Sequence, residues 1–138
     1  MVSVFVSGSF RNHYDSLKRR INEFQSAGFV VVSPMSPMEV PAIDFALLRG
    51  KDHYTDMARI IRKVDANETA LAIRQSDVLF VHNPTGEIEP SSALHFGLAF
   101  GYGKPIFAEK EIEGNVLHGY FKGKTPGEIK GIIAKKRA

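Results

Sequence analysis

The sequence of 138 residues contains no cysteine. Disulfides, thiolate nucleophiles and cysteine-ligated zinc are therefore excluded from its fold and its chemistry. It also lacks any apolar run of the roughly 18 residues that a membrane-spanning helix needs. The N-terminal stretch MVSVFVSGSF has no basic segment of the kind that opens a signal peptide, and it predicts a strand instead. We therefore expect a cytoplasmic protein without a membrane partner.

A strong charge of either sign is also missing. The chain has 18 Lys and Arg against 15 Asp and Glu, which gives a formal net charge of +3. Part of this excess is the terminal Lys135-Lys136-Arg137, which a solvated helix end explains. A basic balance favours anionic ligands, but there is no basic stripe studded with aromatic residues, so we expect no nucleic-acid partner.

The overall composition is that of an ordinary globular protein. Hydrophobic residues make up 43% of the chain and charged residues 24%. This is enough apolar material to bury a core. The length suits one domain, which we place over residues 1–138, and the chain shows no internal repeat or linker.

Strand-like apolar segments alternate with helical patterns along the chain. Leu17, Ile21 and Phe24 recur at helical spacing, and Gly28 ends that helix. Strands are predicted at 2–6, 29–32, 78–81 and 106–108, and further helices at 54–63, 65–75 and 126–135. This order predicts an α/β fold, Rossmann-like (flavodoxin-like), with a mostly parallel sheet of about four or five strands and helices on both faces.

Two further stretches have a defined local chemistry. Thr125 fits the N-cap of the last helix, Pro126 its first position and Glu128 the partner in a capping box. Residues 33–41 hold three prolines and two methionines, which predicts a loop at the end of the second strand, near the site.

The stretch from Gly86 to Pro105, GEIEPSSALHFGLAFGYGKP, links the third and fourth predicted strands through a loop and a helix. In such units ligands bind outside the carboxyl ends of the strands, so this loop is the first candidate for a site. Ser91 and Ser92 are predicted to cap the helix, and capping does not exclude ligand binding. The preceding Gly86, Glu87 and Glu89 make this sequence motif a more specific signal of a site, although loop glutamates are usually only solvated.

Residues Gly8-Ser9-Phe10-Arg11 leave the first strand and enter the first helix. Glycine permits close backbone approach to a ligand, and the Ser9 hydroxyl with neighbouring N–H groups can hold an anion at the helix N-terminus. Arg11 can add a bidentate contact to a phosphate. The alternative is an ordinary turn with a solvent-facing arginine.

The histidines do not indicate a metal site. His82, His95 and His118 fit no metal-binding spacing, so no metal is expected. His95 lies about one helical turn after Ser91. It is either a partly buried histidine or a general acid or ligand contact, because histidine titrates near neutral pH.

Together these residues resemble the nucleoside 2-deoxyribosyltransferase-like superfamily, which includes the 2′-deoxynucleoside 5′-monophosphate N-hydrolases. The resemblance spans roughly residues 2–108. In the nucleotide hydrolases the first loop has the form Gly-Ser-x-Arg and contacts the 5′-phosphate, and Gly8, Ser9 and Arg11 match it. The central family helix has the form Glu-x-Gly-x-Ala and is closed by Gly-Lys-Pro, which residues 95–99 and 103–105 resemble. The resemblance implies a site for a nucleotide.

Both family carboxylates are displaced in this sequence. The family nucleophile, the glutamate that attacks the anomeric carbon and leaves a glycosyl-enzyme intermediate, corresponds to His95. The acid that protonates the base corresponds to Thr69, with Glu68 one residue earlier. Cleavage through a covalent intermediate needs a carboxylate beside the anomeric carbon and an acid for the leaving base, and histidine is a poor substitute for that nucleophile.

Three hypotheses follow. The first is a protein that binds a nucleoside 5′-monophosphate or a related phosphorylated ribosyl compound without the family's covalent chemistry. The second is an active N-glycosidase or deoxyribosyltransferase in which Glu87, Glu89 or Glu68 supplies the carboxylate and His95 the acid. The third is a non-catalytic interaction module, against which the retained Gly8-Ser9-x-Arg11 and Ser91-Ser92 argue.

No cofactor is expected. The resemblance implies a homodimer or larger oligomer, often with the site completed by a neighbouring chain. Phe96 and Phe100 are four residues apart and share a helix face, and Tyr102 follows them. Core packing is the preferred explanation of these aromatic residues, and a dimer interface is the alternative.

Overall fold

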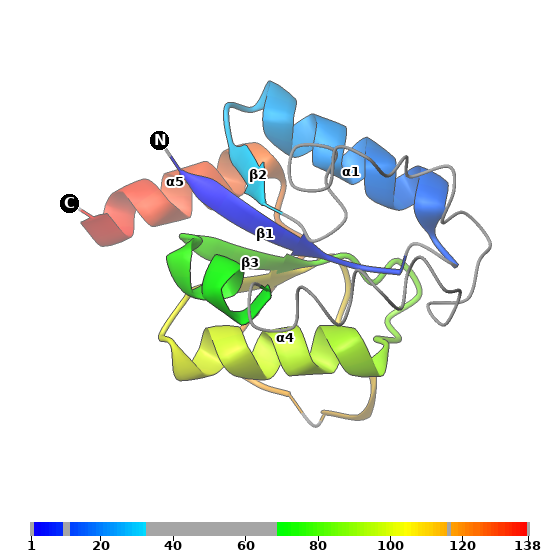
Figure 1. Ribbon diagram of the computed structural model, residues 1–138. Helices are drawn as coiled ribbons and strands as arrows, with labels where there is room; N and C mark the ends of the chain where they lie inside the picture. The colour runs from blue at the N-terminus through cyan, green and yellow to red at the C-terminus, as the bar shows by residue number, and fades with distance from the viewer. Residues whose placement is uncertain (1, 10–11, 33–68, 116, 138) are drawn as a thin grey trace.

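A computed structural model describes residues 2–9, 12–32, 69–115 and 117–137 (Figure 1). The loop predicted at 33–41 and the helix predicted at 54–63 lie outside these residues, as do Phe10, Arg11 and Glu68. Within the described residues, no helix has the length and apolar character needed to cross a membrane.

The centre of the fold is a five-stranded sheet in the order β2-β1-β3-β4-β5. All four strand pairs are parallel. The prediction of a Rossmann-like α/β fold is therefore confirmed, and this strand order is the flavodoxin-like one. The strands are β1 (Ser3–Ser7), β2 (Val30–Val32), β3 (Val78–Val81), β4 (Ile106–Ala108) and β5 (Phe121–Lys122).

Helices cover both faces of the sheet, as predicted (Figure 1). Among the described residues, α1 and α5 pack on one face, and α4 packs on the other together with the helical residues 69–75. The helices are α1 (Tyr14–Ser26), α4 (Pro90–Gly101) and α5 (Pro126–Arg137), with a short 3-10 turn at Glu113–Asn115.

Successive strand residues feed two separate cores. In β1, Val4 and Val6 face α1 and α5, whereas Phe5 faces α4. The first core is centred on Phe24, whose ring lies edge-on to Phe80 with centroids 4.9 Å apart. Because both faces are buried, the strands are apolar at nearly every position, which explains the β-branched runs in the sequence.

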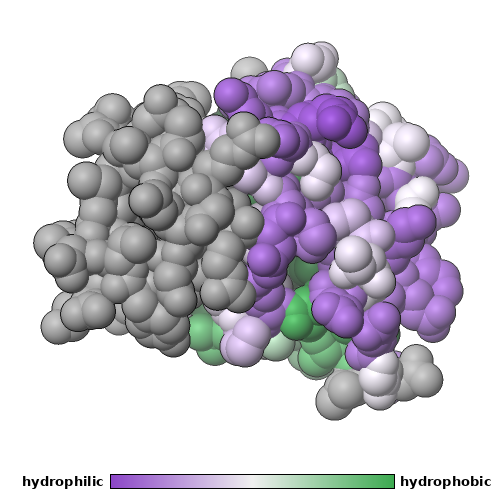
Figure 2. Space-filling view, turned by 90° about the vertical axis from the view of Figure 1, so that its right-hand side faces the viewer, coloured by the Kyte–Doolittle hydropathy of each residue, from purple (hydrophilic) through white to green (hydrophobic). Residues whose placement is uncertain are grey.

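Where the structure describes it, the surface over the carboxyl ends of the strands is mostly polar. Figure 2 looks at this end of the molecule and shows predominantly hydrophilic surface, with hydrophobic surface gathered near its lower edge, the height at which α4 runs in Figure 1. Polar loops at the carboxyl ends of parallel strands are the usual location of a site in this class of fold.

The start of α4 differs from the prediction. The helix begins at Pro90 with Glu89 as its N-cap, so the prediction that Ser91 and Ser92 cap it is wrong. They lie within the first turn. The reason is Pro90, because a proline lacks the N–H that a first-turn residue leaves unpaired and its fixed φ suits that position.

The predicted capping box at α5 is confirmed. The Thr125 N–H donates to Glu128 Oε1 at 3.0 Å, and the Glu128 N–H donates to Thr125 Oγ1 at 3.2 Å. Two N–H groups without helical partners are therefore paired by side chains, which fixes the beginning of the last helix.

Gly8 provides a test of this packing. A Cβ added there would lie 3.0 Å from Leu17 Cδ1 and 3.1 Å from His82 Cβ, because α1 and β3 both press on the end of β1. We expect Gly8→Ala to lower the free energy of unfolding by about 1–3 kcal/mol through overpacking. Denaturant titration measures this change.

The matched control is Gly131→Ala on the exposed side of α5, where an added Cβ meets nothing within 4 Å. That change should raise stability by about 0.5–1 kcal/mol, because alanine is the better helix former. Equal effects of the two substitutions would contradict the close packing at Gly8.

Candidate functional site

The site lies between β1 and β3, where the strand order of the sheet reverses. β1 and β3 are neighbours that end together, with Ser7 paired to Val81 and the His82 N–H donating to the Ser7 carbonyl at 2.7 Å. The loop after β1 leads to α1 on one face, and the loop after β3 leads to α4 on the other. Diverging loops at such a reversal leave a crevice between them.

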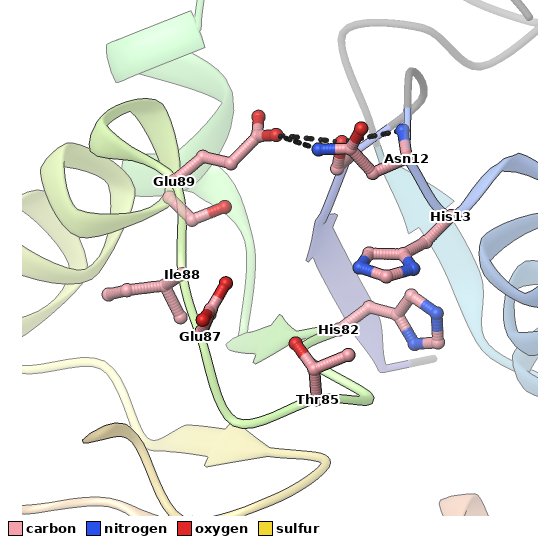
Figure 3. Close-up of a pocket in the computed structure, with 9 residues that line it drawn as sticks. Asn12, His13, His82, Thr85, Glu87, Ile88 and Glu89 are labelled. Carbon is pink, nitrogen blue, oxygen red and sulfur yellow. Dashed lines mark hydrogen bonds between the residues drawn. The ribbon is translucent and has the colours of Figure 1, made fainter. Parts of the chain in front are cut away.

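A pocket of about 390 Å³, its open mouth included, occupies this crevice. It is lined by residues from both loops: Ser9, Asn12, His13, His82, Thr85, Glu87, Ile88, Glu89 and Ser92. Figure 3 shows Glu87, Ile88 and Glu89 on one side and Asn12 and His13 on the other. The pocket thus brings together four predicted site residues, which are Ser9, Glu87, Glu89 and Ser92.

The strongest link across the pocket is made by Glu89. Its Oε1 accepts hydrogen bonds from Ser9 Oγ and from Asn12 Nδ2, each at 2.9 Å. Ser9 Oγ in turn accepts the Asn12 N–H at 3.0 Å. Two loops 80 residues apart in the chain are therefore joined by one carboxylate, whose orientation is fixed by two donors.

Glu87 has a different environment. Its side chain is exposed, and it points into the space between the two walls (Figure 3). Ile88, between the two glutamates, is half-buried and adds an apolar surface to the same wall. The wall before α4 therefore offers one fixed carboxylate, one solvated carboxylate and an apolar side chain.

His82 anchors the floor of the pocket. The side chain is 2% exposed, its Nδ1 lies 2.7 Å from Glu109 Oε2, and its Nε2 lies 2.8 Å from Ser16 Oγ. Glu109 also pairs with Arg20. Both ring nitrogens are thus engaged inside the protein, so His82 gives the pocket its ring surface and no ring nitrogen for a ligand.

This network changes the acidity of Glu109. Burial by itself would raise the pKa of Glu109, but hydrogen bonds and charge from His82 and Arg20 outweigh it and hold the pKa below its ordinary 4.5. Glu109 is therefore ionised at neutral pH and accepts the Nδ1 proton of His82. Ser16 Oγ completes the network, because it lies 2.8 Å from His82 Nε2 and donates to the His13 carbonyl at 3.3 Å.

His95 does not line the pocket. It faces the sheet, with Nδ1 2.7 Å from Ser7 Oγ and its ring edge-on to Phe5 at 5.2 Å. Ser7 Oγ also donates to Ser92 Oγ at 2.9 Å. Among the described residues, His95 is linked to the pocket through the hydroxyls of Ser7 and Ser92, and the role of general acid stays a prediction.

Several other residues that were predicted to bind the ligand do not line the pocket and have structural contacts instead. Gly86 has φ +89° and its carbonyl accepts the Glu113 N–H at 3.1 Å, so it forms the turn after β3. Gly8 lies against α1 and β3, as described above. Neither of them lines the pocket, nor does Ser91. The ligand contacts predicted for Phe10 and Arg11, and the catalytic role of Glu68, fall outside the described residues.

Five lining residues were not predicted, namely Asn12, His13, His82, Thr85 and Ile88, and His82 was considered only as a metal ligand. Asn12 and His13 directly follow the turn at Ser9, and Thr85 and Ile88 lie between residues that the sequence did indicate. The sequence therefore indicated the loops that contain these residues, but it did not indicate that their side chains would face the pocket. No group of three or more potential metal ligands occurs among the described residues.

The network around His82 predicts a pH-dependent contribution to stability. Because the pKa of Glu109 is lowered on folding, its contribution is complete above pH 4.5 and is lost as the pH falls through the folded-state value. We expect Glu109→Gln to cost about 1.5–3 kcal/mol at pH 7. The deficit relative to wild type should shrink below pH 4.5, as measured by urea unfolding at several pH values.

Glu111→Gln is the matched control, since Glu111 and its partner Lys122 are 63% and 58% exposed and 3.6 Å apart. Its effect should stay below about 1 kcal/mol at any pH. A Glu109→Gln deficit that does not change between pH 7 and pH 3 would contradict the proposed ionisation.

Comparison with known proteins found a solved structure with a similar fold. No protein-family model matches the chain, and no curated protein matches it in sequence. A solved structure of a 2-deoxyribosyltransferase from the psychrotolerant bacterium Bacillus psychrosaccharolyticus is similar, with a TM-score of 0.59 and 14% identity over 94% of this chain and 90% of that chain. At this identity the likeness shows that the two chains share a fold.

Proposed function

We propose that the pocket between the two loops binds a nucleoside, either free or as its 5′-monophosphate. The observation that carries this proposal is the convergence of Ser9, Asn12, Glu87 and Glu89 in a pocket at the sheet's reversal point. The fold shared with a 2-deoxyribosyltransferase, a protein used for nucleoside synthesis, supports the choice of ligand class.

The chemistry of the lining suits a ribosyl compound. Sugar hydroxyls are donors, and Glu87 and Glu89 offer carboxylate acceptors for them. Ile88 and the ring of His13 add apolar and aromatic surface against which a base can lie. A pocket with an apolar wall and a few fixed polar groups is the usual form of a small-molecule site.

The family's covalent mechanism is not part of this first proposal. In the family that the sequence resembles, the nucleophile sits on the central helix at the position of His95. Here that side chain contacts Ser7 and Phe5 and does not line the pocket. A binding function without that nucleophile needs no further assumption.

A second candidate is cleavage of the N-glycosidic bond, which the position of Glu89 favours. Glu89 is a fixed carboxylate at the pocket wall, as a nucleophile must be. Its oxygen would attack the anomeric carbon as the C–N bond breaks. The base would leave with the bonding electrons and take up a proton, and water would then hydrolyse the glycosyl ester.

Ligand binding is tested with a panel of the common deoxyribonucleosides, ribonucleosides and their 5′-monophosphates. A bound ligand should raise the melting temperature by mass action, and calorimetry gives its affinity. We expect Asn12→Ala to weaken binding at least about tenfold, because it removes a donor that orients Glu89. Asn22→Ala, an exposed asparagine on α1, is the matched control and should have no effect.

The same samples are followed for release of free base by chromatography. Base release that is lost in Glu89→Gln and retained in Glu113→Gln would establish the second candidate. Binding without base release leaves the first. No binding and no base release across the panel would contradict both, and would leave the interaction module as the explanation.

We also propose that the protein forms a homodimer through α4. This helix contains no Asp, Glu, Lys or Arg, and its outward side carries Leu94, 63% exposed, and Phe100, 62% exposed. A helix that is apolar all round is normally buried. Gly97 and Gly101 lie between these side chains, so a second α4 related by a two-fold axis can approach closely.

Phe96 and Phe100 therefore have different roles. Phe96 is buried in the core, as preferred from the sequence, whereas Phe100 and Tyr102 are exposed, Tyr102 by 41%. We expect Leu94→Glu to convert a dimer to a monomer in sedimentation velocity at micromolar concentration. Leu71→Glu, an exposed leucine outside α4, should leave the dimer intact. A monomeric wild type would contradict this proposal.

A further inference from the structure

The hydroxyl proton of Ser9 is already engaged in a hydrogen bond to Glu89. Ser9 is 4% exposed, its Oγ donates to Glu89 Oε1, and the same Oγ accepts the Asn12 N–H. A serine has a single hydroxyl proton, so it cannot donate to a ligand while it donates to Glu89. Asn12 Nδ2 gives one of its protons to the same carboxylate oxygen.

The arrangement is that of an anion site filled by the chain's own anion. A hydroxyl and an amide from the loop before α1 converge on one oxygen, as they would on an oxygen of a phosphate. That oxygen belongs to Glu89, the N-cap residue of α4. The N-terminus of a helix also favours a negative charge, so α4 stabilises the carboxylate at this place.

Although Glu89 is the N-cap residue of α4, its side chain makes no capping hydrogen bond to that helix. Its side chain extends across the pocket to the loop that follows β1 instead (Figure 3). The carboxylate is therefore placed by its contacts with Ser9 and Asn12, and helix capping does not explain it.

The charge of the pocket also disfavours a phosphate beside Ser9. Its described lining residues include two glutamates and no lysine or arginine. A 5′-phosphate carries a charge of about −1.5 to −2 at neutral pH. Placed at Ser9 it would meet Glu89 directly and Glu87 across the pocket, and like charges in contact are strongly unfavourable in an interface.

We infer that Glu89 is a specificity-determining residue, which selects unphosphorylated nucleosides by occupying the Ser9 and Asn12 donors that would otherwise hold a 5′-phosphate. This inference rests on the proposed function of the pocket and adds the charge of its ligand. A free nucleoside has a neutral 5′-hydroxyl, which can donate to the Glu89 carboxylate where a phosphate would repel it.

The test compares each 2′-deoxynucleoside with its own 5′-monophosphate by calorimetry, in wild type and in Glu89→Gln. In wild type the nucleoside should bind at least about tenfold more tightly than its monophosphate. In Glu89→Gln the charge is gone, the amide can donate to a phosphate, and the preference should vanish or reverse. Ser9→Ala in the Glu89→Gln background should abolish the gain in monophosphate affinity.

Glu87→Gln is the matched control. It removes one negative charge from the same pocket and leaves the Ser9 and Asn12 donors engaged with Glu89. Its gain in monophosphate affinity should be much smaller than that of Glu89→Gln. Equal gains in the two variants would overturn the specific role of Glu89, since total charge alone would then decide.

Arg11 provides the competing explanation, because the sequence resemblance matches it to a phosphate contact. Monophosphates that bind wild type more tightly than their nucleosides, with an affinity that falls in Arg11→Ala, would overturn the inference. All variants are checked for a cooperative thermal transition, so that loss of folding is not taken for loss of binding.

Inorganic phosphate separates a failure of this inference from a failure of the proposed function. We expect phosphate to bind Glu89→Ala at least about tenfold more tightly than wild type, because Ser9 and Asn12 are released. This result does not require that any nucleoside binds. Nucleoside binding to wild type with no phosphate gain in Glu89→Ala would uphold the pocket's function and overturn the role of Glu89.

Discussion

The site depends on the pairing of β1 with β3. These two parallel strands end side by side, with the His82 N–H held by the Ser7 carbonyl at 2.7 Å, and the chains that leave them pass to opposite faces of the sheet. Every lining residue of the pocket follows the end of one or the other strand. A shift of one residue in this register would exchange the side chains that face the two cores, so the hydrophobic pattern that fixes the sheet also fixes the site.

The sequence predicted the sheet well because burial on both faces leaves a local mark. The runs at Val78–Val81 and Ile106–Ala108 are apolar at every position, and both were placed at their observed bounds. The start of α4 was misplaced because Ser91 and Ser92 are of a residue type that favours the N-cap. Pro90 has the stronger preference, which is for the first helical position. Local chemistry therefore predicted most of the elements to within one or two residues, and it misplaced the start of α4, where two local preferences competed.

The candidate site was predictable only as a neighbourhood. Ser9, Glu87 and Glu89 were chosen from loops that should lie at the same edge of the sheet, and they do line one pocket. The bond from Ser9 to Glu89 joins residues 80 positions apart, and its existence depends on which way two side chains turn within the folded loops. Nothing in a single sequence encodes that direction. For the same reason Asn12 and His13 went unnoticed, because an asparagine and a histidine beside a turn have no distinguishing pattern.

The histidine on the central helix and the glutamate at its N-cap are best understood together. His95 Nδ1 lies 2.7 Å from Ser7 Oγ, and the Ser7 proton is given to Ser92, so the imidazole is the donor to Ser7. An ionised glutamate at this position has no proton to give, and it would place a charge against the ring of Phe5. The surroundings of Ser7 therefore favour a hydrogen-bond donor, while the carboxylate of the site stands at Glu89, where two donors and a helix N-terminus stabilise its charge.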